Sequence, residues 1–323
     1  MRVLVTGATG FLGRAIAAEA ADKTIEIVRV GGTHGSACEF NVDVGSAQDV
    51  ARLASAGKVD AVVHAAGIAH RFGNVPDEEY ERINVEGAAN VARLTIKLGA
   101  RHFVHVSSVL VYGRPRNVEA IDESFPCAPE DAYARSKADG ESSVVRICEE
   151  AGIPVTIFRP APMIGEGSRG NFFRLIRAID TRRFIWLGKG ENLKSALYVG
   201  DAARAIRSVL ENKNKDRGTE VFNLAAPAVK MNMIVGTITE ALNKSVPKMR
   251  IPARMPLSTI RAAASLLPVP KIKAVSNTLE KWLSTEIYST ASILAAYGFS
   301  PELSIPEALK REVAAYRAAN PQV

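Results

Sequence analysis

A tyrosine and a lysine four residues apart, Tyr133 and Lys137, are the side chains of this chain best suited to move a proton. Positions four apart share one face of a helix, so the phenol and the ammonium are predicted to project side by side. A free tyrosine has a pKa of about 10, too high for a base at neutral pH. A neighbouring cation lowers that pKa, which makes a tyrosine usable in proton transfer. Chance spacing of the two residues is the competing interpretation.

A helix and a strand must position these groups. Asp131 is a residue type preferred at a helix N-cap, and Ala134 is compatible with a long buried helix that follows it. Residues 102–106 read as a strand that ends in Ser107 and Ser108. Catalytic groups in open parallel sheets gather at the carboxyl ends of strands. The two serines are therefore predicted to bind a substrate oxygen.

A glycine-rich turn follows the first predicted strand, residues 3–5. Gly7, Gly10 and Gly13 have the spacing G-x-x-G-x-x-G, and a helical stretch begins at Arg14. Glycines at a strand-to-helix turn let backbone N–H groups approach a pyrophosphate, which then lies on the positive end of the helix. A glycine triplet alone is weak evidence, but its place between a strand and a helix predicts a dinucleotide site.

The second predicted strand, residues 25–30, lacks the acidic residue that commonly binds the ribose 2′-hydroxyl of NAD. Arg29, with Thr33, His34 or Ser36, is suited to a 2′-phosphate instead. The sequence therefore favours NADP(H) slightly within an NAD(P) site. The alternative is that Arg29 is a surface residue without a ligand.

The third and fourth predicted strands, residues 40–44 and 61–64, also end in residues suited to a cofactor. Asp43 is placed to accept a hydrogen bond from an adenine amine. Small residues after the fourth strand would let a cofactor lie close to the backbone: Ala65, Ala66 and Gly67. His64 is interpreted as a packed residue at the strand end.

Composition describes a globular protein of 323 residues with 47% hydrophobic and 23% charged residues. The net charge of +7 is spread along the chain, which fits an anionic small substrate better than nucleic acid. Three distant cysteines, Cys38, Cys127 and Cys148, favour reduced thiols in a cytoplasm and no metal site. We expect no signal peptide and, since no apolar run reaches about 18 residues, no membrane span.

Alternating strands and helices predict an α/β fold: a Rossmann-like, doubly wound parallel sheet with a smaller, mostly helical C-terminal substrate lobe. The dinucleotide-binding domain is predicted to comprise residues 1–160 and 195–228. Residues 161–194 and 229–323 are predicted to form the substrate-binding lobe. Within this lobe, the apolar stretch Leu266-Leu267-Pro268-Val269-Pro270 is interpreted as core rather than as a membrane-surface segment.

Four motifs in order resemble those of the extended short-chain dehydrogenase/reductases, in particular the nucleotide-sugar epimerase/dehydratase branch. They are Thr6 to Gly13, His64-Ala65-Ala66-Gly67, Ser107-Ser108 followed by Val111-Tyr112-Gly113, and Tyr133 to Lys137. The resemblance is strongest up to about Asp201. It implies a catalytic triad of Ser108, Tyr133 and Lys137, with Lys137 also on the nicotinamide ribose. It further implies these cofactor contacts: Gly7, Thr9, Gly10, Phe11, Leu12, Gly13, Arg29, Asp43, Val44, Ala65, Ala66, Gly67, Tyr133, Lys137 and Pro160.

The same resemblance implies a nucleotide-sugar substrate. Ser107 and Ser108 would contact the sugar. Asn171, the first residue of a helix predicted over residues 171–179, would contact the diphosphate or uracil. Lys194 stands where many relatives carry an arginine for the diphosphate, and lysine lacks the bidentate fork. The family's late arginine motif is missing, and Lys281 is a conjectural substitute. A cytoplasmic homodimer is the expected assembly. It would pair through two long helices, one predicted over residues 77–98 and carrying Asn84, the other carrying Tyr133.

Three reactions share this machinery. A 4,6-dehydratase would have an Asp-Glu pair after the catalytic serine, where this chain has Val109 and Leu110, so dehydration is disfavoured. A UDP-hexose C4 epimerase and a 4-keto-sugar reductase remain near parity. Two further alternatives are a hydroxysteroid- or flavonol-type NADPH reductase and a non-catalytic NADP(H)-binding regulator. A regulator of this fold tends to lose the Tyr–Lys pair, which this chain retains.

Overall fold

The computed structural model describes residues 1–21, 24–33, 38–68, 75–114, 119–212, 218–245, 250–251 and 283–320. The chain divides into two compact units. The first comprises Met1–Ala161, Leu197–Ala225 and Tyr288–Glu302, and the second Pro162–Ala196, Ala226–Ile287 and Leu303–Val323. Residues 288–302, which the sequence analysis assigned to the C-terminal lobe, thus belong to the first unit. His34, Ser36, Lys281 and the stretch 266–270 lie outside the described residues.

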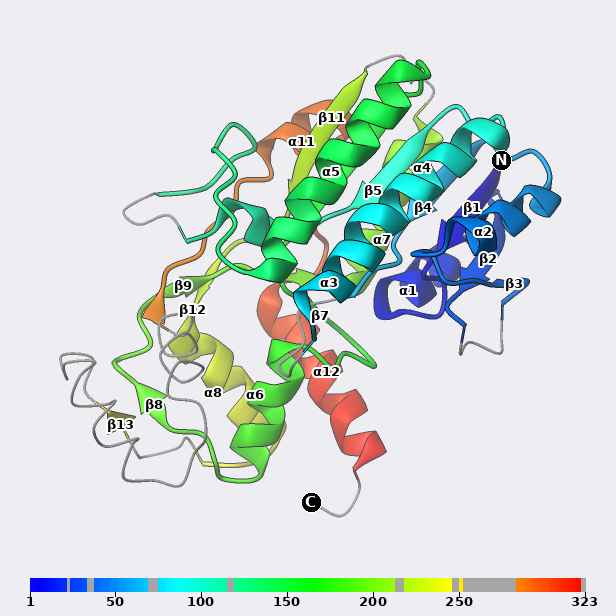
Figure 1. The fold of residues 1–323 in the computed structure, drawn as a ribbon. Helices are drawn as coiled ribbons and strands as arrows, with labels where there is room; N and C mark the ends of the chain where they lie inside the picture. Colours follow the sequence, from blue (N-terminus) through cyan, green and yellow to red (C-terminus); the bar gives the residue numbers. More distant parts are fainter. Residues whose placement is uncertain are drawn as a thin grey trace. The chain divides into compact units, whose positions relative to one another are not determined.

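A seven-stranded parallel sheet forms the centre of the first unit, as predicted (Figure 1). Its strands run in the order β11 (Thr219–Leu224), β6 (Val155–Pro160), β5 (Phe103–Val106), β4 (Ala61–His64), β1 (Arg2–Thr6), β2 (Glu26–Gly31) and β3 (Phe40–Asn41). The late strand β11 pairs with β6, which confirms the predicted return of the chain to this sheet. Strand order reverses next to β1, between β1 and β4, where α/β sheets of this type bind ligands.

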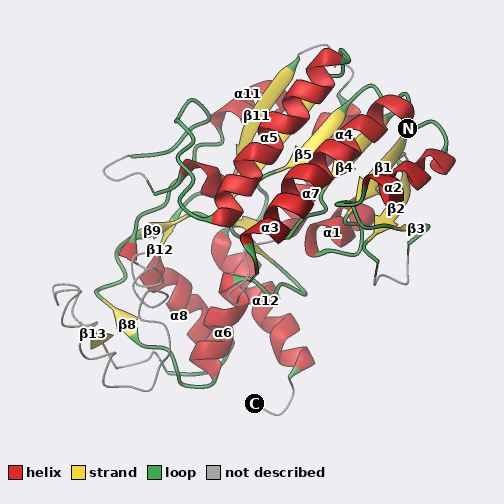
Figure 2. Ribbon diagram, viewed as in Figure 1, coloured by secondary structure: helices red, strands yellow, loops and turns green. Residues whose placement is uncertain are grey.

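Helices cover both faces of this sheet, and every residue of β4 and β6 is buried. Strands buried on both faces are near-continuous apolar runs, as these are. Helix α4 packs on α5 and helix α1 on α7, and Figure 2 shows α4 and α5 lying across the near side of the strands. The helices of this unit are α1 (Phe11–Glu19), α2 (Ala47–Ala51), α3 (Asp77–Tyr80), α4 (Gly87–Lys97), α5 (Ala132–Glu150), α7 (Val199–Glu211) and α11 (Ala291–Tyr297).

Short non-α segments interrupt the helical stretches that the sequence predicts as continuous. The predicted helix over residues 77–98 contains a π-helical segment, η2 (Glu81–Glu86), between α3 and α4. Two 3-10 segments, η1 (Arg52–Ala56) and η3 (Val109–Tyr112), follow α2 and Ser108. A π-helical turn shifts the side chains that follow it and is frequent at functional sites. Strand β10 (Leu197–Tyr198) leads directly into α7.

The second unit is built mainly from α6 (Asn171–Asp180), α8 (Met231–Ala241) and α12 (Ile305–Ala319). Helix α12 packs on both α6 and α8. It begins with a capping box in which the Ser304 side chain and the Glu307 carboxylate bond each other's backbone N–H groups. The short strands of this unit are β7 (Met163–Ile164), β8 (Trp186–Leu187), β9 (Leu193–Lys194), β12 (Val229–Lys230) and β13 (Arg250–Ile251).

Candidate active site

Ser108, Tyr133 and Lys137 come together at the carboxyl end of β5. Ser108 is the N-cap of η3, and its hydroxyl accepts a hydrogen bond from the Leu110 N–H at 3.2 Å. The same hydroxyl forms a hydrogen bond with the phenol of Tyr133. The buried Lys137 ammonium donates to the Val106 carbonyl at 2.7 Å, two residues before Ser108. One strand end and one helix thus bring all three side chains into one compartment.

The pKa of Tyr133 contradicts the expectation that Lys137 lowers it. Burial of the phenol raises the pKa of Tyr133 to about 12, and the hydrogen bond with Ser108 offsets only part of this effect. The Lys137 ammonium faces a backbone carbonyl instead. Burial also lowers the pKa of Lys137 to about 8, while Glu141 raises it. Both shifts favour the neutral form of the side chain, because burial disfavours the charged form.

Asn84 fixes the position of α5 from the π-helical segment η2. Its Oδ1 accepts from the Ile68 N–H at 2.9 Å, and its Nδ2 donates to the Ile68 carbonyl at 3.2 Å and to Ser136 Oγ at 3.0 Å. A Cβ at Gly140 would lie 2.6 Å from the Asn84 carbonyl oxygen, so only glycine permits this approach. The sequence analysis placed Asn84 on a helix without assigning it this role. The glycine inside an otherwise helical pattern was a usable signal.

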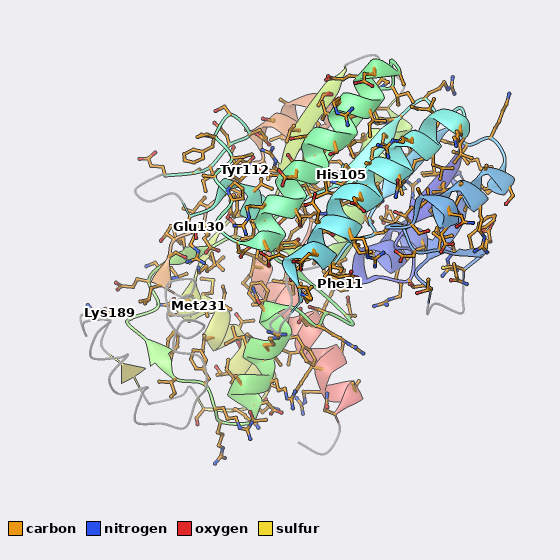
Figure 3. The ribbon with its side chains drawn as sticks, in the orientation of Figure 1. Phe11, His105, Tyr112, Glu130, Lys189 and Met231 are labelled. Atoms are coloured by element: carbon orange, nitrogen blue, oxygen red, sulfur yellow. The ribbon has the colours of Figure 1, made fainter. Side chains whose placement is uncertain are left out.

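The glycine turn has the close approaches that a dinucleotide cradle requires. Gly7 has φ +70°, and a Cβ there would lie 2.7 Å from the Ala66 nitrogen. A Cβ at Gly13 would lie 2.1 Å from the Gly7 oxygen. Helix α1 begins at Phe11, labelled in Figure 3, and its N-cap Gly10 provides no side-chain hydrogen bond. The first N–H groups of α1 are therefore suited to a pyrophosphate.

Two buried polar side chains hold this turn against the end of β4. Thr6 Oγ1 and His64 Nδ1 are 2.8 Å apart, and Thr6 Oγ1 also accepts from the Ala66 N–H. His64 stacks on His105 with ring centroids 5.5 Å apart. Burial and, to a smaller extent, the Lys137 charge lower the pKa of His64 to about 3, so the imidazole is neutral. This agrees with the interpretation of His64 as a packed strand-end residue.

Arg29 and Asp43 lie at the ends of β2 and β3. Within the described residues, the Arg29 Nε is buried and has no hydrogen-bond partner. An orphaned guanidinium N–H fits an anionic ligand group, because an unsatisfied buried donor is costly. Asp43 Oδ1 accepts from the Gly45 N–H at 2.9 Å, and its Oδ2 pairs with Arg82 at 2.6 Å. Both carboxylate oxygens of Asp43 thus already have partners within the chain. A hydrogen bond from an adenine amine would be an additional contact.

A buried ion pair connects α5 to η3. Arg159, in β6, forms two hydrogen bonds with Glu141, at 2.6 and 3.0 Å, and both side chains are 8% exposed. Arg159 also donates to the Tyr112 hydroxyl at 2.9 Å, which donates to Asn223 at 2.8 Å. Tyr112 is labelled in Figure 3. Glu141 lies one turn beyond Lys137 and Tyr112 four residues beyond Ser108, so this network connects the two elements that carry the candidate catalytic groups.

The remaining predicted substrate contacts have different surroundings. Ser107 Oγ is buried, and no partner for it lies among the described residues. Asn171 is exposed at the first position of α6, in the second unit. Lys194, also in the second unit, is buried and forms an ion pair with Glu286 at 3.1 Å. This charge pairing makes Lys194 a weaker diphosphate ligand than an unpaired cation, and both substrate assignments stay predictions.

Two absences hold for the described part of the chain. No three His, Cys, Asp or Glu side chains gather there as a metal site would require. No helix there is long and apolar enough to cross a bilayer.

Together, the parallel sheet and the glycine turn at its switch point define a Rossmann-like fold. The family model described as "NAD dependent epimerase/dehydratase family" matches residues 3–225. The chain belongs to this family, which confirms the resemblance found in the sequence.

Curated relatives include 4-epimerases. The chain is 33% identical over 255 residues to N-acetyl-alpha-D-glucosaminyl-diphospho-ditrans,octacis-undecaprenol 4-epimerase of Escherichia coli O157:H7, covering 77% of this chain and 75% of that protein. It is 25% identical over 331 residues to UDP-glucose 4-epimerase of Vibrio cholerae, covering 98% and 96%. The solved UDP-glucuronic acid 4-epimerase from Bacillus cereus in complex with NAD has a TM-score of 0.78 at 19% identity, with 99% of both chains covered. That structure supports the fold.

Proposed function

We propose that this protein is a 4-epimerase that inverts the hydroxyl-bearing C4 carbon of a hexose linked through a diphosphate. The observation that carries the proposal is the hydrogen bond between the Ser108 hydroxyl and the Tyr133 phenol, with the Lys137 ammonium anchored two residues before Ser108. A hydroxyl donor beside a phenol is suited to polarise one carbinol oxygen and move its proton. The named relatives favour epimerisation over the reduction of a 4-keto sugar.

The cradle built by Gly7, Gly13 and α1 fits NAD(P), whose nicotinamide, when bound, would accept a hydride from C4 and return it. Tyr133 would take the C4 hydroxyl proton and give it back after the ketone has turned its other face. Ser108 would hold the reacting oxygen throughout. Lys137, whose ammonium is anchored at the Val106 carbonyl, would bind a ribose hydroxyl of the cofactor. The protein thus positions and polarises the substrate, while the redox step belongs to the cofactor.

The choice between NAD and NADP depends on Arg29. Family membership and the NAD-bound solved relatives support NAD. The orphaned Arg29 Nε supports a contact with a 2′-phosphate and therefore NADP. For an epimerase, either dinucleotide serves, because the cofactor returns to its starting oxidation state in each cycle. The proposal accordingly specifies a bound NAD(P)⁺.

Two carriers for the hexose follow from the relatives. The Vibrio protein is named for a UDP-linked sugar and the Escherichia protein for an undecaprenol-linked one. Both carriers attach the sugar through a diphosphate. We propose the lipid-linked 2-acetamido sugar as the first substrate to test, because the relative with that name has the higher identity.

The experiment incubates the protein, with added NAD⁺ or NADP⁺, with UDP-glucose, UDP-N-acetylglucosamine and polyprenyl-diphospho-N-acetylglucosamine. Proton NMR or mass spectrometry of the released sugar then identifies the C4 epimer. The proposal expects inversion at C4 of at least one of these sugars without net change in nicotinamide absorbance. Stoichiometric consumption of NADPH with a 4-keto sugar, and no inversion, would instead identify the reductase.

A further inference from the structure

The two units carry opposite net charge. The sequence of the second unit contains 19 Lys and Arg residues against 8 Asp and Glu, and the first unit contains 22 against 26. The basic excess of the whole chain therefore belongs to the second unit. A charge asymmetry between two parts of one chain is typical of proteins that contact an extended anionic partner.

Part of this charge is concentrated where three helices of the second unit end. Arg177 lies in the last turn of α6, Arg182 and Arg183 follow that helix, Lys244 follows α8, and Arg317 lies in the last turn of α12. We name these five residues the basic end. The three helices pack on one another. The Arg317 guanidinium donates to the Ala241 carbonyl at 3.2 Å, which joins the ends of α12 and α8.

One buried carboxylate lies at the centre of the basic end. Asp180 Oδ1 pairs with Lys244 at 2.5 Å, and its Oδ2 accepts from the Tyr316 hydroxyl at 2.9 Å. Burial raises the pKa of Asp180, but the hydrogen bonds from Lys244 and Tyr316, together with the charges of Lys244 and Arg317, hold it below its usual range. Glu240 is an exposed carboxylate at the end of α8. Five cations against two carboxylates leave a local excess of positive charge.

Helix stabilisation accounts for only part of this arrangement. Cations near a helix C-terminus interact favourably with its dipole, which explains Lys244 and Arg317. Arg182 and Arg183 lie beyond α6 and are exposed. Within the described residues, neither they nor Arg177 has a carboxylate within ion-pair distance. Their charges therefore remain available to a partner.

An exposed apolar side chain adjoins the two arginines. Ile185 is 41% exposed and follows Arg183 by two residues. Between them, Phe184 packs edge-on against Trp186, with ring centroids 5.3 Å apart. Basic side chains next to an exposed apolar one suit the headgroup region of a bilayer, which offers both anionic and hydrocarbon surface.

We propose that the basic end docks on the surface of a membrane containing anionic phospholipids. The reason for such docking depends on the proposed function, because a diphosphate sugar on a lipid carrier is presented at a bilayer. The charges and exposures that carry the proposal do not depend on it. Each basic residue near an anionic membrane surface strengthens binding by about 1 kcal/mol, a factor of about five. The three arginines that have no ion-pair partner among the described residues, Arg177, Arg182 and Arg183, are enough for salt-sensitive, reversible association.

The test measures co-sedimentation of the full chain with vesicles, in the absence of any sugar. Vesicles of phosphatidylcholine alone are compared with vesicles that contain equal parts of phosphatidylcholine and phosphatidylglycerol. We expect binding to the anionic vesicles only. This binding should weaken when the salt concentration rises from about 50 to about 300 mM, which is from about one-third to about twice physiological ionic strength. Arg182→Glu with Arg183→Glu should weaken vesicle binding by at least about 25-fold.

A matched control reverses two exposed cations of the first unit, Arg52→Glu with Lys58→Glu, which changes the net charge equally. This control should retain most of the vesicle binding. Circular dichroism establishes that both variants are folded. Equal loss in both variants would mean that net charge, not the basic end, governs binding. Either that result or no binding of the native chain to anionic vesicles would overturn the proposal, whatever the outcome of the epimerase assay.

Discussion

At the scale of single residues, the Tyr133 phenol is the group on which the proposed chemistry depends. It forms a hydrogen bond with Ser108, yet burial raises its pKa to about 12. Spacing along the helix predicted that the Lys137 ammonium would lower its pKa, but this ammonium bonds the Val106 carbonyl instead. Desolvation is a property of the packed site, and a pattern four residues long carries no information about it. Positive charge from a bound nicotinamide would favour the phenolate.

Replacement of Tyr133 by phenylalanine tests the assignment of the proton-transfer group. The variant Tyr133→Phe should reduce turnover by about 10²–10⁴-fold, the range for loss of a positioned acid or base. Cofactor affinity should change little, since Gly7, Gly13 and α1 remain intact. Turnover comes from the NMR assay of C4 inversion and affinity from calorimetry. Unchanged turnover in a folded variant would exclude Tyr133 from catalysis.

Arg29 carries the prediction about the cofactor. Replacement by aspartate, Arg29→Asp, introduces the acid that usually binds a ribose 2′-hydroxyl and repels a 2′-phosphate. The ratio of NADP to NAD affinity should fall by at least about tenfold, as measured by calorimetric titration with each dinucleotide. Arg29→Ala is the control, because it removes the cation without adding an acid. If neither change moves the ratio, Arg29 has no part in cofactor selection.

Residue-level prediction succeeded where chemistry follows from local spacing. Asp131 caps α5 through a hydrogen bond to the Ala134 N–H at 2.9 Å, as its residue type predicted. The partners of Asp43 were not predictable, because Arg82 lies 39 residues away in sequence. Pairing across such distances depends on how η2 meets the loop that follows β3, which only the fold defines.

At the scale of elements, the ends of β4 and β5 place two neutral histidines beside a buried ammonium. The pKa of His64 is about 3 in the folded chain, and that of His105 is lowered well below its ordinary value by burial and by Lys137. The unfolded chain therefore binds protons that the folded chain excludes. Each group contributes stability above pH of about 6.5, and this stability is lost as the pH falls.

Acid should therefore lower the free energy of unfolding, and protonation of His64 should account for part of this loss. The free energy of unfolding should fall by about 1.4 kcal/mol per pH unit for each such histidine below pH of about 6.5. Urea denaturation at several pH values between about 4 and 7 measures this slope. His64→Gln should make the slope shallower while lowering stability near neutral pH. Equal slopes for the two proteins would show that His64 is protonated in the folded state.

The ion pair between Glu141 and Arg159 joins the helix of Tyr133 to the turn that follows Ser108. Breaking a buried pair leaves an uncompensated charge, so Glu141→Gln should cost about 3–5 kcal/mol of stability. Tyr112→Phe removes one hydroxyl and should cost about 1–3 kcal/mol. Both values come from denaturant unfolding. Costs below about 1 kcal/mol for both variants would mean that this network does not hold α5 and η3 together.

Element prediction was accurate where apolar periodicity is strong. Strand β4 has the predicted bounds, and α6 begins at the predicted residue, Asn171. The π-helical segment inside the predicted helix over 77–98 was not foreseen, since its sequence has an ordinary helical pattern. The requirement that Asn84 reach the Ile68 backbone and Ser136 together explains the altered turn. These contacts depend on residues in neighbouring segments, which a local helical pattern does not reveal.

At the scale of the whole molecule, the division of charge between the units is the feature that the sequence analysis did not detect. It read the net charge as evenly spread, because basic residues occur along the whole chain. The predicted bounds of the substrate-binding lobe, residues 161–194 and 229–323, already contain this basic excess, but the charge was not counted lobe by lobe. The parallel sheet itself was predictable, because alternating strands and helices leave few other topologies.

The homodimer expected from the sequence remains a prediction, and an exposed residue supports it. Helix α4, one of the two long helices expected at the interface, carries Ile96, which is 44% exposed. Light scattering should give a mass twice that of the 34.6 kDa chain. Ile96→Glu should shift this mass toward that of a monomer, because a charge opposes burial in an apolar interface. A monomeric mass of the native chain would contradict the prediction.

The central claim is that Ser108, Tyr133 and a nicotinamide act together on the C4 carbon of a diphosphate-linked hexose. Its most direct test uses a sugar substrate carrying deuterium at C4, in ordinary water, with the product examined by mass spectrometry and NMR. The account predicts an inverted sugar that retains its deuterium at C4, because the hydride leaves and returns within one site. An inverted sugar that has lost this deuterium to solvent, or inversion at another carbon, would contradict the account.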